Sequence, residues 1–274
     1  MYHRYTWRTG VLELVMIVVA LIFFVPAYVL INLSFRASND PAGPLALPTT
    51  FTLKNYGDAW VQGHLGNALG NSAVITIVSV FVLVLCSALA AYPLARVTRR
   101  WSRIAFFTFL VGLLLPFQLA LIPLYTTMRD LGLLGTVWSL ILFYIGLQMP
   151  FSIFLYTGFL RALPAEYEEA AAIDGASPFE TFWRVVFPLL RPVTGTVVIL
   201  NVIVVWNDFL TPLLYLSGSG TQTVPVAVYS FVGQYVSQWN LVFAGLVISI
   251  APILIVYFVL QKTVIQGFAS GLKG

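Results

Sequence analysis

The chain has 274 residues, of which 59% are hydrophobic and only 9% are charged. Soluble domains carry about 25% charged residues, so this chain cannot cover itself with a water-facing surface. A net charge of +4 from 14 basic and 10 acidic residues does not change that balance. An ordinary soluble enzyme, a nucleic-acid-binding module and a disordered regulator are therefore excluded.

The apolar residues are concentrated in six long blocks, each with at most one formal charge. A helix needs about 20 apolar residues to cross the roughly 30 Å hydrocarbon layer of a bilayer. The first block follows Arg4 and Arg8, as a signal peptide would, but its length and the lack of an A-x-A-like site favour a permanent anchor. We predict an all-α integral membrane protein, one transmembrane domain over residues 1–274, with six transmembrane helices. The expected spans are Leu12–Phe35, Ala68–Leu94, Ile104–Met128, Thr136–Leu160, Val193–Leu216 and Val242–Leu260.

The lysines and arginines are divided unequally between the two sides of this topology. Eleven fall on the side of the two termini and of the loops after spans two and four, and three fall on the other side. Because positive loops stay in the cytoplasm, both termini are expected to be cytoplasmic. The eleven are Arg4, Arg8, Arg96, Arg99, Arg100, Arg103, Arg161, Arg184, Arg191, Lys262 and Lys273, and the three are Arg36, Lys54 and Arg129.

Prolines interrupt most of the expected spans. Each removes a backbone hydrogen bond and tends to kink its helix. Two interpretations stay open: irregularity that membrane helices tolerate, or bent helices around a cavity that opens and closes. They include Pro26, Pro116, Pro123, Pro150, Pro212 and Pro252.

The loop between spans four and five, residues 161–191, is expected to fold as two short helices. Pro164 suits a first helical turn, acidic residues and a run of alanines follow, and Gly175 ends the first helix. Ser177 and Glu180 form a capping box for the second helix.

The second helix of this loop has an apolar stripe that we expect to lie against the membrane-embedded helices. Its members are Phe179, Phe182, Trp183 and Val186, and Pro188 is expected to end the helix.

The 161–191 loop carries three basic and five acidic residues, which argues against nucleic acid as a partner. Small alanines next to Tyr167 would let another protein approach closely. The loop is either a structured connection without a partner or a docking element for a cytosolic protein, and the second interpretation explains the alanines and the acids together.

These residues resemble the EAA loop of ABC importer permeases. The matching residues are Glu169-Ala170-Ala171, Gly175 and the later Val185-Val186-Phe187-Pro188, where Val185 and Phe187 replace the more usual Ile and Leu. In that family the loop docks into a cleft of the ATP-hydrolysing subunit. The resemblance implies that Glu168, Glu169, Ala170, Ala171, Asp174, Gly175 and Pro188 mediate coupling to an ATPase.

The resemblance to the carbohydrate branch, of the maltose (MalG-like) type, extends over nearly the whole chain. It includes Leu53–Tyr56, Ala90–Arg96, Ile122–Tyr125 and Trp206–Leu210, and the ending Gln266–Gly274. In that family the C-terminal tail, here residues 261–274, reaches between the two ATPase subunits. The tail residues implied are Gln266, Gly267, Gly271 and Lys273.

The resemblance implies a multi-pass protein of a bacterial or archaeal plasma (inner) membrane, a permease subunit of an ATP-driven sugar or oligosaccharide importer. The implied partners are a second homologous permease chain, two cytoplasmic ATP-binding subunits that hold ATP and Mg, and an extracellular or periplasmic solute-binding protein.

Several polar or aromatic residues within the spans are candidates for the substrate path. Asp208 is the one acid deep in a span, where a charge costs roughly 2.5–3.5 kcal/mol near the bilayer centre. Amides and hydroxyls can bind sugar hydroxyls, but they can equally join helices. The candidates are Gln118, Tyr144, Gln148, Asn201, Trp206, Asn207 and Asp208.

Other functions have weaker support in the sequence. All three lysines follow Leu or Gln, so the Gly-Lys pair of a phosphate-binding loop is absent, and ATP must be hydrolysed by another polypeptide. A stand-alone secondary carrier and an ABC permease for a non-sugar solute such as glycerol phosphate remain alternatives. An intramembrane enzyme is disfavoured, because His3 and His64 lie outside the spans and one cysteine with scattered acids cannot form a metal site. We therefore expect no catalytic residue, metal or cofactor in this chain.

Overall fold

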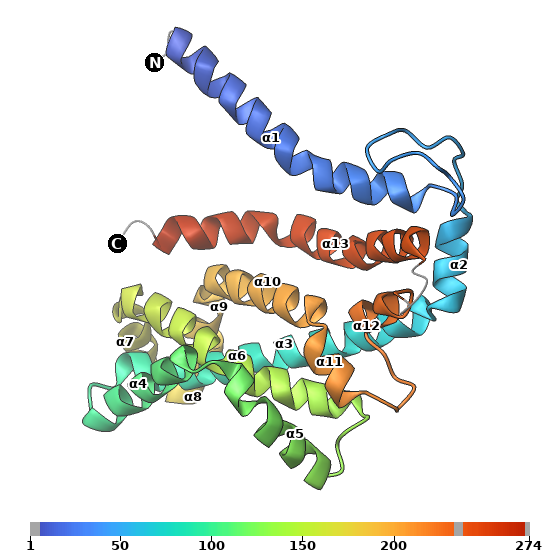
Figure 1. The fold of residues 1–274 in the computed structure, drawn as a ribbon. Coiled ribbons are helices and arrows are strands. Elements are labelled where there is room, and N and C mark those ends of the chain that lie inside the picture. The colour runs from blue at the N-terminus through green and yellow to red at the C-terminus, as the bar shows by residue number, and fades with distance from the viewer. Residues whose placement is uncertain (1–5, 233–237, 272–274) are drawn as a thin grey trace. The chain divides into compact units, whose positions relative to one another are not determined.

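The computed structural model describes residues 6–232 and 238–271; from residue 260 onward it describes the backbone and the side chain of Gln261. The described chain is helical apart from loops and an isolated antiparallel bridge between Arg36 and Phe51. In chain order (Figure 1) the elements are α1 Trp7–Ser34, α2 Lys54–Gln62, α3 Leu65–Arg96, α4 Arg100–Leu114, the 3₁₀ turn η1 Phe117–Ala120, α5 Leu121–Asp130, α6 Val137–Ala162, α7 Glu166–Ile173, α8 Pro178–Thr181, the π-helical turn η2 Phe182–Val186, α9 Phe187–Leu189, α10 Arg191–Asn207, α11 Leu210–Tyr215, α12 Val224–Tyr229 and α13 Trp239–Gly271.

Among the described residues, four helices are long and apolar enough to cross a membrane, and two bent helix pairs raise the number of candidate spans to six. The four are α1, α3, α6 and the Trp239–Val259 part of α13. They match the first, second, fourth and sixth predicted spans, which extend past them by one residue at Phe35, Thr136 and Leu260. The protein is thus an all-helical membrane protein whose described residues form four to six candidate spans.

The third predicted span, Ile104–Met128, is not one straight helix. α4 ends at Leu114, and the following helical segment, Phe117–Asp130, is turned by 91° from it. Leu115 and Pro116 at the break both have extended backbones. The cause is Pro116, which has no N–H to donate and disfavours helical geometry at the residue before it.

The fifth predicted span, Val193–Leu216, is also broken. α10 ends at Asn207, and Asp208 has an extended backbone with φ −67° and ψ 128°. Its Oδ1 accepts hydrogen bonds from the backbone N–H groups of Leu210 (3.1 Å) and Thr211 (3.4 Å), the first two residues of the short helix α11. The acid thus satisfies backbone donors that the break leaves without helical partners.

The chain forms two compact units: Met1–Gly66 with Ala227–Ala251, and Asn67–Val226 with Pro252–Gly274. The first unit is organised around the buried side chain of Asn55. Its amide donates to the backbone oxygens of Ser34 (2.9 Å) and Arg36 (2.8 Å), and its Oδ1 accepts from the Asn240 amide (2.8 Å). One side chain of α2 therefore joins the end of α1 to the start of α13.

The loop after α1 is folded around the buried guanidinium of Arg36, which donates to the backbone oxygens of Ala42, Gly43 and Ala46. Asp40 lies 3.9 Å from the Arg36 Nε. The backbone N–H groups of Ala42 and Thr49 donate to this carboxylate and lower the pKa of Asp40. Because loop carbonyls otherwise need water, the cation allows this segment to fold compactly.

In the second unit, one apolar core joins the 161–191 loop to the membrane helices. Phe182 and Val186 of η2 are buried against α3, α6 and α10, and Trp183 packs at its edge. The predicted stripe is wrong at one position: Phe179 is 68% exposed. It belongs to the α-helical turn before η2, and the wider π-helical turn separates its direction from that of Phe182. The predicted end at Pro188 is also displaced, since the chain bends by 72° at Leu190.

We predict that Asn55→Ala destabilises the first unit, because it leaves two buried backbone oxygens and the Asn240 amide without their partner. The expected loss is on the order of 3 kcal/mol. Thermal unfolding of the detergent-purified protein measures it. Asn39→Ala, the same change at an exposed position, should shift stability by less than about 0.5 kcal/mol. Equal midpoints for the two variants would contradict the assigned role of Asn55.

Candidate functional site

The 161–191 loop contains the two short helices that its sequence predicts. α7 carries three acidic residues in its first turn, where the helix dipole favours negative charge. Gly175 follows with φ +82°, a left-handed conformation that costs other residues about 1–2 kcal/mol. The backbone N–H of Glu180 donates to Ser177 Oγ (3.3 Å), and the backbone N–H of Ser177 donates to Glu180 Oε2 (3.0 Å), which completes the capping box of α8.

Polar contacts fix the first helix of the loop to the end of α3. The Arg96 Nε donates to Glu168 Oε1 at 2.8 Å, and its Nη2 also reaches the backbone oxygen of Leu163 at 3.0 Å. The Tyr92 hydroxyl donates to Glu168 Oε2 at 3.0 Å. Both carboxylate oxygens of Glu168 are thus used within the chain, and its side chain is only 14% exposed.

The residues predicted for coupling therefore separate into two groups. Glu168 and Ala171 face inward, and Pro188 is half-buried. The others are exposed: Glu169, Ala170, Asp174 and Gly175.

The 161–191 loop, which lies outside the span-forming helices, also has large apolar side chains that are exposed. Ile173 is 86% exposed, Phe179 68% and Tyr167 50%. Exposed apolar groups rimmed by acids are typical of protein docking surfaces. Sequence reasoning missed Ile173 and Phe179 as surface residues.

The sequence-based prediction also missed the residues that anchor the loop to the rest of its unit. Arg96 and Tyr92 lie in the segment Ala90–Arg96, which resembles the carbohydrate permeases, but the resemblance indicates no role for them. Arg161 is a further anchor, with its guanidinium 4.5 Å from the centre of the Phe106 ring. Pairing an arginine with a glutamate 72 positions away is visible only in three dimensions.

Two of the predicted path residues lie together. The Tyr144 hydroxyl donates to Asp208 Oδ2 at 2.9 Å, which links α6 to the break between α10 and α11. With the two backbone bonds to Oδ1, both oxygens of Asp208 are occupied. Tyr144 itself is 1% exposed.

The remaining path candidates are dispersed. Asn201 is buried and its amide donates to Ser152 Oγ of α6 (3.2 Å), the interhelical contact that was the alternative interpretation. Gln118 and Asn207 are exposed, and Gln148 is half-buried. In the tail, the backbone is helical at Gln266, Gly267 and Gly271, while the Gln266 side chain and all of Lys273 lie outside the described residues.

Trp206 lines a cavity of about 630 Å³ formed by α3, α10 and α13. Its walls are apolar side chains apart from Thr76, whose hydroxyl has no hydrogen-bond partner among the described atoms. Such walls offer few partners for the hydroxyls of a polar solute. Within the described part of the chain, no group of three or more His, Cys, Asp or Glu residues could hold a metal ion.

The geometry of an all-helical membrane protein agrees with the relationships of the chain. Residues 84–269 match the family described as binding-protein-dependent transport system inner membrane component. The chain is 36% identical over 256 residues to the probable starch degradation products transport system permease protein AmyC of Thermoanaerobacterium thermosulfurigenes, with 93% of each chain covered. It is 34% identical over 266 residues to the melibiose/raffinose/stachyose import permease protein MelC of Bacillus subtilis, with 96% of each covered.

A chain in the crystal structure of a bacterial ABC transporter involved in the import of the acidic polysaccharide alginate has the same fold. The TM-score is 0.82 at 24% identity, with 96% of this chain and 98% of that chain covered. The chain belongs to the family of binding-protein-dependent transport system inner membrane components, as a multi-pass permease subunit of an ABC importer that leaves ATP hydrolysis to a partner protein.

Proposed function

We propose that this permease imports a sugar or oligosaccharide and forms half of the translocation path, with a second homologous permease chain forming the other half. The observation that carries the sugar assignment is the similarity, over at least 93% of both chains, to relatives named for starch degradation products and for melibiose, raffinose and stachyose. The apolar walls of the α3–α10–α13 cavity support a shared path, since the second chain would then supply polar contacts that this cavity lacks.

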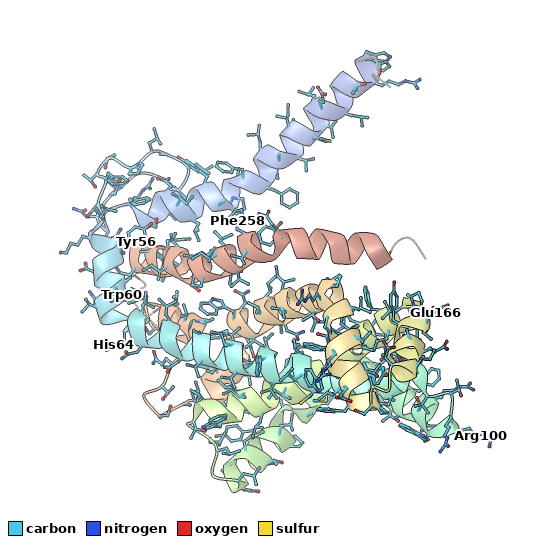
Figure 2. All side chains as sticks on the ribbon, turned by 180° about the vertical axis from the view of Figure 1, so that it is seen from behind. Tyr56, Trp60, His64, Arg100, Glu166 and Phe258 are labelled. Atoms are coloured by element: carbon cyan, nitrogen blue, oxygen red, sulfur yellow. The ribbon has the colours of Figure 1, made fainter. Side chains whose placement is uncertain are left out.

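We propose that the end of the second unit that carries the 161–191 loop faces the cytoplasm, together with both termini. Arg100 and Glu166 lie at the same end of this unit in Figure 2, and the ion pair from Arg96 to Glu168 joins α3 to α7 there. The α3–α4 turn and the 161–191 loop together carry Arg99, Arg100, Arg103, Arg161, Arg184 and Arg191, and by the positive-inside rule such an excess of arginine supports a cytoplasmic side.

Coupling to the ATPase follows from how the loop is held. Two ATP-binding subunits would each engage one permease chain, here at the exposed face of Tyr167, Glu169 and Ile173. Because Glu168 is bound to Arg96 and Tyr92, displacement of that face moves α3 with it. α3 lines the apolar cavity, so a rigid loop transmits movement of the ATPases to the wall of the path. The solute-binding protein would deliver sugar at the opposite side.

The sugar assignment is tested with the complex co-purified with its partner proteins and reconstituted into liposomes. We expect uptake of maltotriose, raffinose or melibiose that needs ATP on the ATPase side and the binding protein on the other. Glycerol 3-phosphate serves as the non-sugar control. Uptake of glycerol 3-phosphate alone, or sugar uptake driven by an ion gradient without ATPase subunits, would overturn the proposal.

Coupling is tested by Glu169→Lys. Glu169 is exposed, so the variant should insert and fold. The lysine should oppose binding of an ATPase whose docking surface carries positive charge to match the acidic loop, because like charges at an interface cost several kcal/mol. We expect sugar uptake to fall by at least about tenfold and the ATPase to lose stimulation by the loaded binding protein. Asp130→Lys on α5 makes the same change in charge at an exposed site away from the loop and should transport normally. Normal transport by both variants would count against the docking role.

We also propose that Tyr144 and Asp208 act by fixing the α10–α11 break beside the path. Tyr144→Phe removes the bond to Asp208 Oδ2 and should lower the maximal uptake rate several-fold without changing the half-saturating sugar concentration. Tyr156→Phe is the matched control, since the Tyr156 hydroxyl bonds Thr194 of α10 (3.0 Å) away from the break. A raised half-saturating concentration in Tyr144→Phe would instead indicate direct contact with sugar.

A further inference from the structure

The turn between α3 and α4 carries three exposed arginines that the proposed transport mechanism does not use: Arg99, Arg100 and Arg103. Two nearby arginines have partners within the chain: Arg96 binds Glu168, and the Arg161 guanidinium lies over the Phe106 ring. Within the described residues the three form no ion pair with a carboxylate. This end of α4 therefore presents a concentrated positive charge that the chain itself does not neutralise; Arg100 projects away from the helices of its unit (Figure 2).

The charge continues into an apolar stripe on the same face of α4. Ser102 and Phe106 point inward: the Ser102 hydroxyl donates to the backbone oxygen of Leu94 (3.4 Å), and Phe106 is buried. Spacings of three and four residues place the exposed side chains along one side of the helix. In order, that side presents Arg100, Arg103, Phe107, Val111 and Leu114.

The length of this stripe corresponds to one leaflet of a bilayer. From Arg103 to Leu114 the helix rises by roughly 16 Å at ~1.5 Å per residue. Half of a ~30 Å hydrocarbon core is about the same. The stripe ends where α4 breaks at Leu115 and Pro116. Trp101, 51% exposed, lies beside the arginines at the level where tryptophan favours the membrane–water interface.

We propose that this face of α4 is a binding site for an anionic phospholipid. Arg100 and Arg103, with Arg99 beside them, bind the headgroup phosphate through charge-assisted hydrogen bonds, and an acyl chain lies along Phe107, Val111 and Leu114. A zwitterionic lipid would leave the excess positive charge uncompensated, so the site distinguishes lipids by net charge. The inference is independent of which solute the protein transports.

The test measures lipid preference of the purified complex in nanodiscs by the immobilised fraction of spin-labelled phosphatidylglycerol against spin-labelled phosphatidylcholine. We expect the wild type to prefer phosphatidylglycerol, and Arg100→Gln/Arg103→Gln to lose up to about 30-fold of that preference, at about 1 kcal/mol per arginine near an anionic surface. Arg100→Lys/Arg103→Lys should retain most of it. The control Arg129→Gln/Arg184→Gln removes two arginines that already face carboxylates and should retain the preference.

Rising salt should weaken the wild-type preference, which gives a measurement that does not depend on folding of any variant. Added inorganic phosphate at equal ionic strength should weaken it no further, because the acyl chain contributes to binding. The proposal is overturned if the wild type shows no preference, if Arg100→Gln/Arg103→Gln retains it, or if the control pair loses it equally.

Discussion

The contact between Arg96 and Glu168 determines how the 161–191 loop is held on α3. An exposed ion pair contributes less than about 1 kcal/mol, whereas breaking a buried pair costs about 3–5 kcal/mol. This pair lies between these limits, with exposures of 20% and 14%, and Tyr92 and the Leu163 carbonyl complete its hydrogen bonds. It makes the surface loop an extension of α3. Without it the loop would keep its apolar packing, the Tyr92 hydrogen bond to Glu168 and the contacts of Arg161, but it would lose its ion pair to α3.

The need to satisfy backbone hydrogen bonds away from water explains the form of the broken helices. At the first break, Pro116 has no N–H to satisfy, and the chain resumes as a 3₁₀ turn. At the second, Asp208 accepts the N–H groups of Leu210 and Thr211, and Tyr144 occupies its other oxygen. The acid that looks costly in a membrane sequence is thus the group that makes an interrupted helix possible in this part of the fold.

Local signals in the sequence predicted local structure well. The apolar blocks of α1, α3, α6 and α13, the capping box of Ser177 and the stop at Gly175 all depend on residues within a few positions of each other. The long-range partners could not be predicted, because no periodicity relates Arg96 to Glu168 or Tyr144 to Asp208. The prediction that Phe179 belongs to the buried stripe was wrong for a related reason. It assumed a uniform α-helix, and the π-helical turn that follows has no clear signature in composition.

That turn also has a consequence for how the gene can change. A π-helical turn amounts to one extra residue inserted in an α-helix. Loss of a single codon between positions 182 and 186 would leave a regular helix of good composition, yet everything beyond it would be rotated by about 100° relative to what precedes it. Such a deletion would preserve hydropathy and membrane insertion while misaligning α7 and α8 with α10. Point substitutions in this stretch are therefore far more accessible to evolution than changes in its length.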